Sequence, residues 1–129
     1  MKNARTHEQL LADARKPRQT KYHNVKTVVD GITFGSKDEA ARYAELQFME
    51  AGGKIRDLVV HPKFEITIGG VKVCTYTADS SYWEQRKGFV IEDVKSGPTR
   101  TTAYRLKKRL MKAVLGLTVE EWPGKEREP

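Results

Sequence analysis

Cysteine is almost absent from this sequence, and no long apolar run occurs in it. The 129 residues include one cysteine, Cys74, which excludes a disulfide within the chain and a zinc site built on paired cysteines. No stretch approaches the roughly 18 apolar residues of a membrane-spanning helix, and no signal peptide is recognisable. We therefore expect no membrane partner, a cytoplasmic location and one domain with a modest core.

Acidic residues are outnumbered by basic ones. There are 17 Asp and Glu against 24 Lys and Arg, so the formal net charge is +7. Hydrophobic residues make up 38% of the chain and charged residues 32%, which is typical of a globular protein with a small core. A positive excess of this size favours a polyanionic partner, most often nucleic acid. A basic protein without such a partner is the alternative.

Composition divides the chain into three parts. Residues 1–24 form a polar, basic N-terminal arm, residues 25–120 a folded domain, and residues 121–129 a C-terminal tail. Within the arm, Arg18 and Lys21 are candidates for contacts with the phosphates of a nucleic acid. A disordered tail explains the same composition equally well.

The order of elements expected in the domain is typical of an α+β fold. The Asp-Gly pair at 30–31 lies between two strand-forming triplets and predicts a hairpin over residues 27–34. Ser36 followed by Glu39 resembles a capping box, and the Gly-Gly pair at 52–53 ends the helix that this box begins.

The second half of the domain predicts strands and then a helix. Residues 54–95 are rich in Val, Ile, Thr and aromatic residues and predict a meander of three antiparallel strands within a mixed sheet, with turns at 69–70 and 84–88. Residues 98–118 predict the last helix, which is strongly basic. The side chains expected to pack from the two helices are Ala40, Tyr43, Leu46, Phe48 and Met49, then Tyr104, Leu106, Leu110, Met111, Val114 and Leu115.

The stretch GFVIEDVKSG at residues 88–97 begins as a buried strand and ends in charged residues. Alternate side chains of a strand share a face, so Asp93 and Lys95 are expected side by side at the strand's exit. A carboxylate there suits a hard cation, and a lysine beside it suits a role in orienting water or neutralising charge on a phosphate. An exposed ion pair at a strand end is the alternative.

Two further acids are candidates for the same site. Asp79 interrupts a neutral run in the strand that should pair with the one bearing Asp93, so the two carboxylates are expected to converge. A turn or bulge around Asp79 is the alternative, because strand register cannot be read from this sequence. Glu39 lies one turn into the first helix, where capping alone would also explain it.

An acid on a first helix, an Asp on a strand, a (D/E)-x-K on the next strand and a basic helix together resemble the PD-(D/E)XK nuclease superfamily. More closely, the chain resembles a family of small phage-encoded proteins regarded as endonucleases of this type. The resemblance covers roughly residues 21–120 and implies a restriction-endonuclease-like core. The matching stretches are KYHNVKTVVDGITFGSKDEAARYAEL, GGKIRDLVVHPKFEI, YTADSSYW and VIEDVKSGPTRTTAYRLKKRLM.

The resemblance implies a role for each matching residue. Asp79 would be the central ligand of Mg²⁺ or Mn²⁺, and Asp93 the second, with the backbone carbonyl of Val94 beside them. Lys95 would position the attacking water and stabilise the charge that develops on phosphorus. Glu39 would hold the metal directly or through water. The remaining implied contacts are to DNA and come from the basic helix and its approach, namely Arg100, Arg105, Lys107 and Lys108.

The sequence departs from the family pattern at three positions. An aspartate often stands where this chain has Gly35, a glutamine where it has His61, and an apolar residue where it has Ser80. His61 could replace the polar side chain of that glutamine, but without a second His or Cys at zinc spacing it is a weak metal ligand by sequence alone.

The function that the resemblance implies is metal-dependent hydrolysis of DNA phosphodiesters. Branched DNA such as a Holliday junction is the implied substrate, a homodimer would match the two-fold symmetry of a junction, and a phage-encoded protein would act in the bacterial host cell. A non-catalytic DNA-binding protein on the same fold is one alternative, and an RNA-binding or protein-interaction module is another. The strand aromatics Tyr76, Tyr82 and Trp83 could stack on bases, but aromatic residues of strands are more often core residues, so no base-reading residue is assigned.

Overall fold

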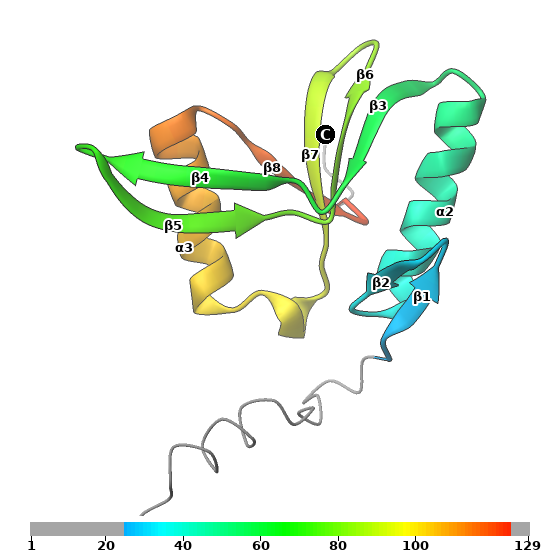
Figure 1. Ribbon diagram of the computed structural model, residues 1–129, viewed down its shortest axis with the longest axis horizontal. Coiled ribbons are helices and arrows are strands. Elements are labelled where there is room, and N and C mark those ends of the chain that lie inside the picture. Colours follow the sequence, from blue (N-terminus) through cyan, green and yellow to red (C-terminus); the bar gives the residue numbers. More distant parts are fainter. Residues whose placement is uncertain (1–24, 125–129) are drawn as a thin grey trace, which may run out of the picture.

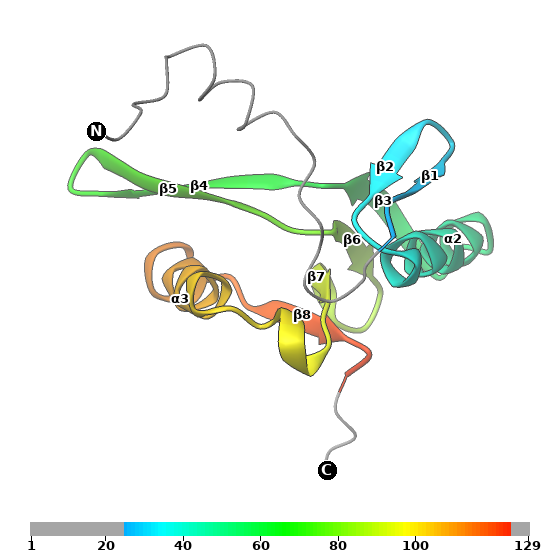
Figure 2. The same ribbon diagram turned by 90° about the horizontal axis from the view of Figure 1, so that it is seen from below.

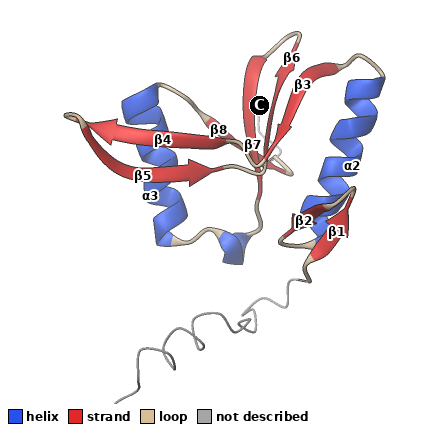
Figure 3. Cartoon of the chain, in the orientation of Figure 1, coloured by secondary structure: helices blue, strands red, loops and turns tan. Residues whose placement is uncertain are grey.

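The computed structural model of the protein describes residues 25–124, and this part of the chain has an α+β architecture (Figure 1; Figure 3). The predicted fold class is therefore confirmed. Arg18 and Lys21, predicted to contact DNA, belong to the N-terminal arm and lie outside the described residues. The elements in chain order are β1 (Thr27–Val29), β2 (Ile32–Phe34), α2 (Lys37–Ala51), β3 (Ile55–Val60), β4 (Lys63–Ile68), β5 (Val71–Thr77), β6 (Ser80–Glu84), β7 (Gly88–Val94), the 3₁₀-helix η1 (Gly97–Thr99), α3 (Thr102–Leu110), the π-helical turn η2 (Met111–Leu115) and β8 (Val119–Trp122).

The N-terminal hairpin and helix form as predicted. β1 pairs antiparallel with β2 across the Asp-Gly turn, where Asp30 has φ 53° and Gly31 has φ 77°, as the favoured two-residue hairpin turn requires. The Ser36 side chain caps α2 by accepting a hydrogen bond from the Glu39 N–H at 3.2 Å. The cap is not the reciprocal box expected, because the Glu39 carboxylate accepts from the Gly35 N–H, at 3.1 Å.

The central sheet has the order β3–β6–β7–β8. Residues 54–95 form five strands, β3 to β7, rather than the three expected. The predicted turns at 69–70 and 84–88 join β4 to β5 and β6 to β7, and the hairpin β4–β5 is separate from the central sheet. In the central sheet β3, β6 and β7 are antiparallel, and the parallel pairing of β8 with β7 makes the sheet mixed, as predicted. The predicted tail begins too early, because β8 crosses the boundary at residue 120 and ends at Trp122.

The last helix is shorter than predicted and follows a 3₁₀ turn. α3 begins at Thr102, capped by the Thr101 hydroxyl, which accepts from the Tyr104 N–H at 3.1 Å. Viewed from below, α3 lies beneath the β4–β5 hairpin on one side of the central sheet, while α2 lies on the other side (Figure 2). The result is a sheet covered by one helix on each face, with the hairpin extending over α3 (Figure 1).

The faces of β7 follow the alternation that the sequence predicts. Ile91 packs with Tyr104 and Met111 of the C-terminal helical segment, whereas Val90 packs with Leu46 of α2. Three of the side chains expected in the helix stripes are exposed instead, because the buried face of each helix is narrower than the apolar pattern suggests; they are Phe48, Leu106 and Leu115.

A buried ionic cluster joins α2 to the sheet. Glu92 of β7 is 3% exposed and receives two hydrogen bonds from the Arg42 guanidinium, at 2.7 and 2.9 Å, and one from the Tyr82 hydroxyl at 2.7 Å. The Arg42 guanidinium also lies 4.7 Å from the centre of the Trp122 ring. The helix, the two central strands and β8 are therefore fixed to one another through a single arginine.

Across residues 25–124, the structure contains no helix that is long and apolar enough to span a membrane.

Candidate active site

Asp79 and Asp93 converge at the end of the central strands, as predicted. Ser80 pairs with Glu92, which sets Asp79 opposite Asp93. The Asp79 N–H donates to Asp93 Oδ1 at 2.8 Å, and the Val94 N–H donates to Asp79 Oδ2 at 2.7 Å. Asp79 itself lies in the bend between β5 and β6 rather than within a strand. The bend that was the alternative interpretation of Asp79 is therefore present, and the two carboxylates converge nevertheless.

Each of these two carboxylates has one oxygen held by a backbone N–H, which fixes its position. Asp93 is 4% exposed. The alternative interpretation of Asp93 and Lys95 as an exposed ion pair is therefore wrong for the aspartate. A buried, backbone-anchored carboxylate is suited to present its second oxygen to a cation or to solvent in one direction.

Glu39 joins this pair from the first turn of α2. One oxygen of its carboxylate is used by the Gly35 N–H. A side chain at position 35 would bring a Cβ to 3.3 Å from the other Glu39 oxygen, so glycine leaves room for the carboxylate. Glu39 thus takes part in the local structure before α2 while facing Asp79, and the structural and functional interpretations of this residue are compatible.

His61 is the residue of the site that sequence reasoning set aside. Glu39, His61 and Asp79 each offer one ligand atom, and these atoms lie within 4.8 Å of one another. His61 follows β3, donates its N–H to the Asp79 carbonyl at 3.0 Å and places its ring 5.6 Å from that of Phe34. Its φ of 56° is uncommon for a residue other than glycine, and such backbone conformations cluster at functional sites.

Burial makes the three acids of the site costly to ionise. Burial raises the pKa of Asp93 to about 6, although the Asp79 N–H and the Lys95 ammonium act in the opposite direction. Burial also raises the pKa of Asp79. The pKa of Glu39 is raised by burial and then by the neighbouring Asp79 charge. Carboxylates that are costly to ionise in the metal-free protein would gain from a bound cation.

Lys95 shares a cavity with the two aspartates. The cavity has a volume of about 340 Å³ and lies where the ends of β5 and β7 meet α3. The Lys95 ammonium lies 4.2 Å from the centre of the Tyr104 ring, which holds it by a cation–π contact. The residues that line the cavity with Asp79, Asp93 and Lys95 are Thr75, Tyr76, Thr77, Thr101, Ala103, Tyr104 and Lys107.

The basic helix is only partly available for a polyanion. Glu121 of β8 accepts hydrogen bonds from Arg100 at 2.8 Å and from Lys108 at 3.2 Å, so these two predicted contacts are engaged within the protein. Burial acts to raise the Glu121 pKa, but hydrogen bonds from Tyr104, Arg100 and Lys108 outweigh it and lower the pKa to about 2. The role of Glu121 was missed because residues 121–129 were interpreted as a tail.

The other two predicted DNA contacts of the basic helix, Lys107 and Arg105, have different surroundings. The Lys107 ammonium donates to the Thr75 carbonyl at 3.2 Å and lines the cavity with the aspartates. Arg105 is exposed and also faces a second cavity along α3. Of the four DNA contacts predicted on this helix and its approach, Lys107 and Arg105 are therefore the two whose side chains do not bond to Glu121 in the described structure.

The comparisons with known proteins give a family and no activity. A family model described as "Protein of unknown function (DUF1064)" matches residues 19–122. No curated protein and no solved structure matches the chain.

Proposed function

The chain belongs to the DUF1064 family, and on the geometry of its site we propose that it is a metal-dependent DNA endonuclease. The observation that carries the proposal is the convergence of Glu39 from α2, His61 and Asp79 from two bends, and Asp93 from the end of β7. Lys95 lies in the same cavity as the aspartates. The resemblance to the PD-(D/E)XK superfamily supports it, because the Asp, the (D/E)-x-K and the helix acid of that pattern are the residues that meet.

The donor set fits a divalent cation such as Mg²⁺ or Mn²⁺. Glu39, His61 and Asp79 would hold the ion, with Asp93 and the Val94 carbonyl completing the site as the resemblance implies. Carboxylate oxygens suit both ions, and an imidazole nitrogen shifts the balance from Mg²⁺ towards Mn²⁺. When bound, such an ion offsets negative charge on the phosphoryl and leaving oxygens of a phosphodiester.

Lys95 supplies the second positive charge of the proposed reaction. Its ammonium is held over the Tyr104 ring, beside the aspartates in the shared cavity. From there it orients a water for in-line attack on phosphorus and stabilises the charge that develops in the transition state. A lysine is suited to this task because its three donors rotate freely and its charge is concentrated at one point.

The DNA would approach along the basic side of the cavity. Lys107, which lines the cavity, is the proposed phosphate contact beside the acids, and Arg105, which faces the second cavity along α3, is a proposed contact farther from them. Arg18 and Lys21 of the arm are proposed from the sequence alone. The proposed substrate is branched DNA, and a homodimer would place one site on each of two strands of a junction. The competing proposal, a non-catalytic DNA-binding protein, draws on the net charge of +7 alone.

Cleavage of a labelled four-way junction and of its matched linear duplex tests the proposal. We expect wild-type protein to cut in Mg²⁺ or Mn²⁺, and more readily in Mn²⁺, but not in Ca²⁺ or EDTA. The ratio of junction to duplex cutting measures selectivity for branches. Salt-dependent binding to both DNAs without cutting in any metal would favour the non-catalytic protein instead.

A further inference from the structure

Two aromatic side chains are exposed at the end of the sheet away from the acids. Trp83 of β6 is 41% exposed and Phe89 of β7 is 39% exposed. They are cross-strand partners, with ring centres 5.3 Å apart. Sequence reasoning placed Trp83 in the core together with Tyr76 and Tyr82; the two tyrosines are buried, but Trp83 is not. Single exposed apolar residues are normal on a protein surface, but two aromatic rings side by side form a patch that is suited to contact a partner.

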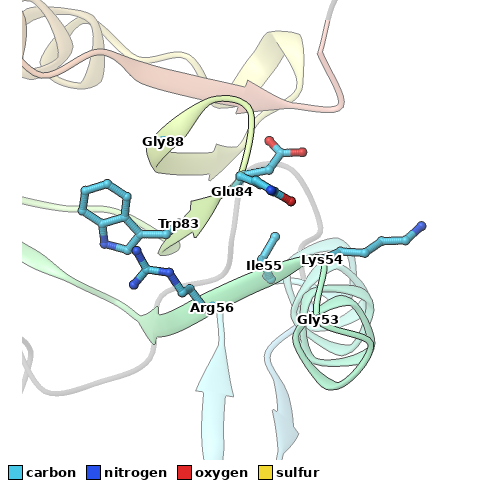
Figure 4. Close-up of a pocket in the computed structure, with 8 residues that line it drawn as sticks. Gly53, Lys54, Ile55, Arg56, Trp83, Glu84 and Gly88 are labelled. Carbon is cyan, nitrogen blue, oxygen red and sulfur yellow. The ribbon is translucent and has the colours of Figure 1, made fainter.

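We define Trp83, Phe89 and Arg56 together as an aromatic platform, in which the Arg56 guanidinium lies over the indole ring. Arg56 lies opposite Trp83 in the sheet, with its guanidinium carbon 5.2 Å from the centre of the indole ring. Figure 4 shows the Arg56 and Trp83 side chains together on one side of a pocket, with Lys54 pointing away from them. The pocket has a volume of about 460 Å³, enough for one heterocyclic base.

The charge around the platform is mixed but carries more bases than acids. Its cations are Lys54, Arg56, Arg86 and Lys87, and its acids are Asp57, Glu84 and Glu120. Asp57 is already paired with Arg56, and Lys87 with Glu120, both at exposed positions. Exposed aromatic rings interleaved with lysine and arginine are typical of surfaces that bind single-stranded nucleic acid.

The platform lies on the same face of the sheet as the acids. Side chains of a strand share a face at every second residue, and Trp83 is four residues from Asp79 while Phe89 is four residues from Asp93. At about 3.3 Å per residue, the two sites are about 13 Å apart along the strands. Ile91, which lies between Phe89 and Asp93 on this face, is covered by Tyr104 and Met111. A single strand bound at both sites would therefore pass beside the C-terminal helical segment and would need more nucleotides than this distance alone requires.

We propose that the platform stacks unpaired bases of the DNA strand that is cut at the acids. The proposal rests on the proposed nuclease function and, among branched DNAs, favours those with unpaired nucleotides beside the scissile phosphodiester, such as a flap, over a fully paired four-way junction. Bases inside a duplex are covered on both faces by their neighbours, so only an unpaired base can expose a face to Trp83. The arginine neutralises backbone charge or stacks on a second base.

Binding in Ca²⁺, without cutting, tests the stacking separately from the chemistry. Trp83→Ala is measured against Phe48→Ala, which removes an 81% exposed aromatic from α2 on the opposite face of the sheet. We expect Trp83→Ala to weaken binding to a flap with unpaired nucleotides about tenfold and binding to the fully paired duplex hardly at all. Phe48→Ala should leave both affinities unchanged. An equal loss on the two DNAs, or no loss on the flap, would overturn the proposal.

Fluorescence gives a second measurement that does not depend on affinity. The protein has two tryptophans, so Trp122→Phe leaves Trp83 as the sole source of tryptophan emission. Oligothymidylate should quench this emission, as expected for direct stacking, and paired duplex should not. Absence of quenching at saturating oligothymidylate contradicts stacking, whether or not the protein cuts DNA. Quenching in a protein that cuts no DNA would instead overturn the nuclease proposal and leave the strand-binding surface intact.

Discussion

Replacing Asp93 by asparagine should abolish DNA cleavage and at the same time make the metal-free protein harder to unfold at neutral pH. Loss of a ligand or of a residue that orients one typically costs tenfold to a hundredfold in metal affinity or activity, and we expect a loss of about a hundredfold or more. The gain in stability arises because the buried Asp93 carboxylate is ionised at neutral pH at a cost to the fold.

The direction of the pH dependence follows from the raised pKa of Asp93. Its pKa rises from 3.8 to about 6 on folding, mainly because the carboxyl is buried. The protonated group therefore favours the folded state fully below pH 3.8, and this contribution is lost as the pH rises through about 6. A shift of this size, which already includes the opposing effect of Lys95, corresponds to about 3 kcal/mol of unfolding free energy.

Urea unfolding in EDTA at pH 5 and pH 7.5 measures this effect. Wild-type protein should lose stability between these pH values, and Asp93→Asn should lose less and be the more stable of the two at pH 7.5. Asp57→Asn is the matched control, because the Asp57 side chain is 61% exposed and its backbone φ of 56° is one that asparagine tolerates. A destabilised Asp93→Asn variant at pH 7.5 would show that the carboxylate is structural.

Replacing Arg42 by alanine should destabilise the fold by about 3 to 5 kcal/mol. The substitution removes the guanidinium from Glu92, which is 3% exposed and would keep only the Tyr82 hydroxyl as a hydrogen-bond donor. An uncompensated buried carboxylate is far more costly than a lost surface ion pair. Since domains of this size are stable by roughly 5 to 15 kcal/mol, this variant should lie near the limit of folding.

Chemical unfolding of a small series distinguishes lost charge pairing from lost packing. Arg42→Met keeps an apolar stem against the Trp122 ring, which the guanidinium now contacts, and should remain strongly destabilised. The double variant Arg42→Met with Glu92→Gln should recover part of the loss, because no charge then remains buried. If Arg42→Ala costs less than about 1 kcal/mol, Glu92 must be solvated or protonated in the folded protein.

Local sequence signals predicted the parts of the fold that depend on neighbouring residues. The Asp-Gly turn fixes β1 and β2, and the Ser36 cap fixes the start of α2, because both act within a few residues. The parallel pairing of β8 with β7 depends on residues about 28 positions apart, such as Ile91 and Val119, and no local pattern encodes it. Residues 121–129 were interpreted as a tail for that reason.

The candidate site divides in the same way into residues that local sequence patterns predict and a residue whose position depends on distant contacts. The acids were found because carboxylates are rare within apolar strands, and the convergence of Asp79 with Asp93 followed from pairing of the two strands. His61 was set aside because its proximity to Glu39 depends on a left-handed backbone conformation that no residue pattern announces. The one signal available in the sequence was that His61 stands where the family pattern often has a glutamine.

Titration of Mn²⁺ into metal-free protein tests the central claim, that the converging acids form a divalent-metal centre, most directly. Calorimetry should show saturable binding to wild-type protein, strong loss of affinity in Asp79→Asn, and a loss in His61→Ala that is larger for Mn²⁺ than for Mg²⁺. Bound Mn²⁺ should also raise the wild-type melting temperature. Equal affinity of wild-type and Asp79→Asn protein for Mn²⁺, or no binding by either, would contradict the metal centre and with it the proposed nuclease.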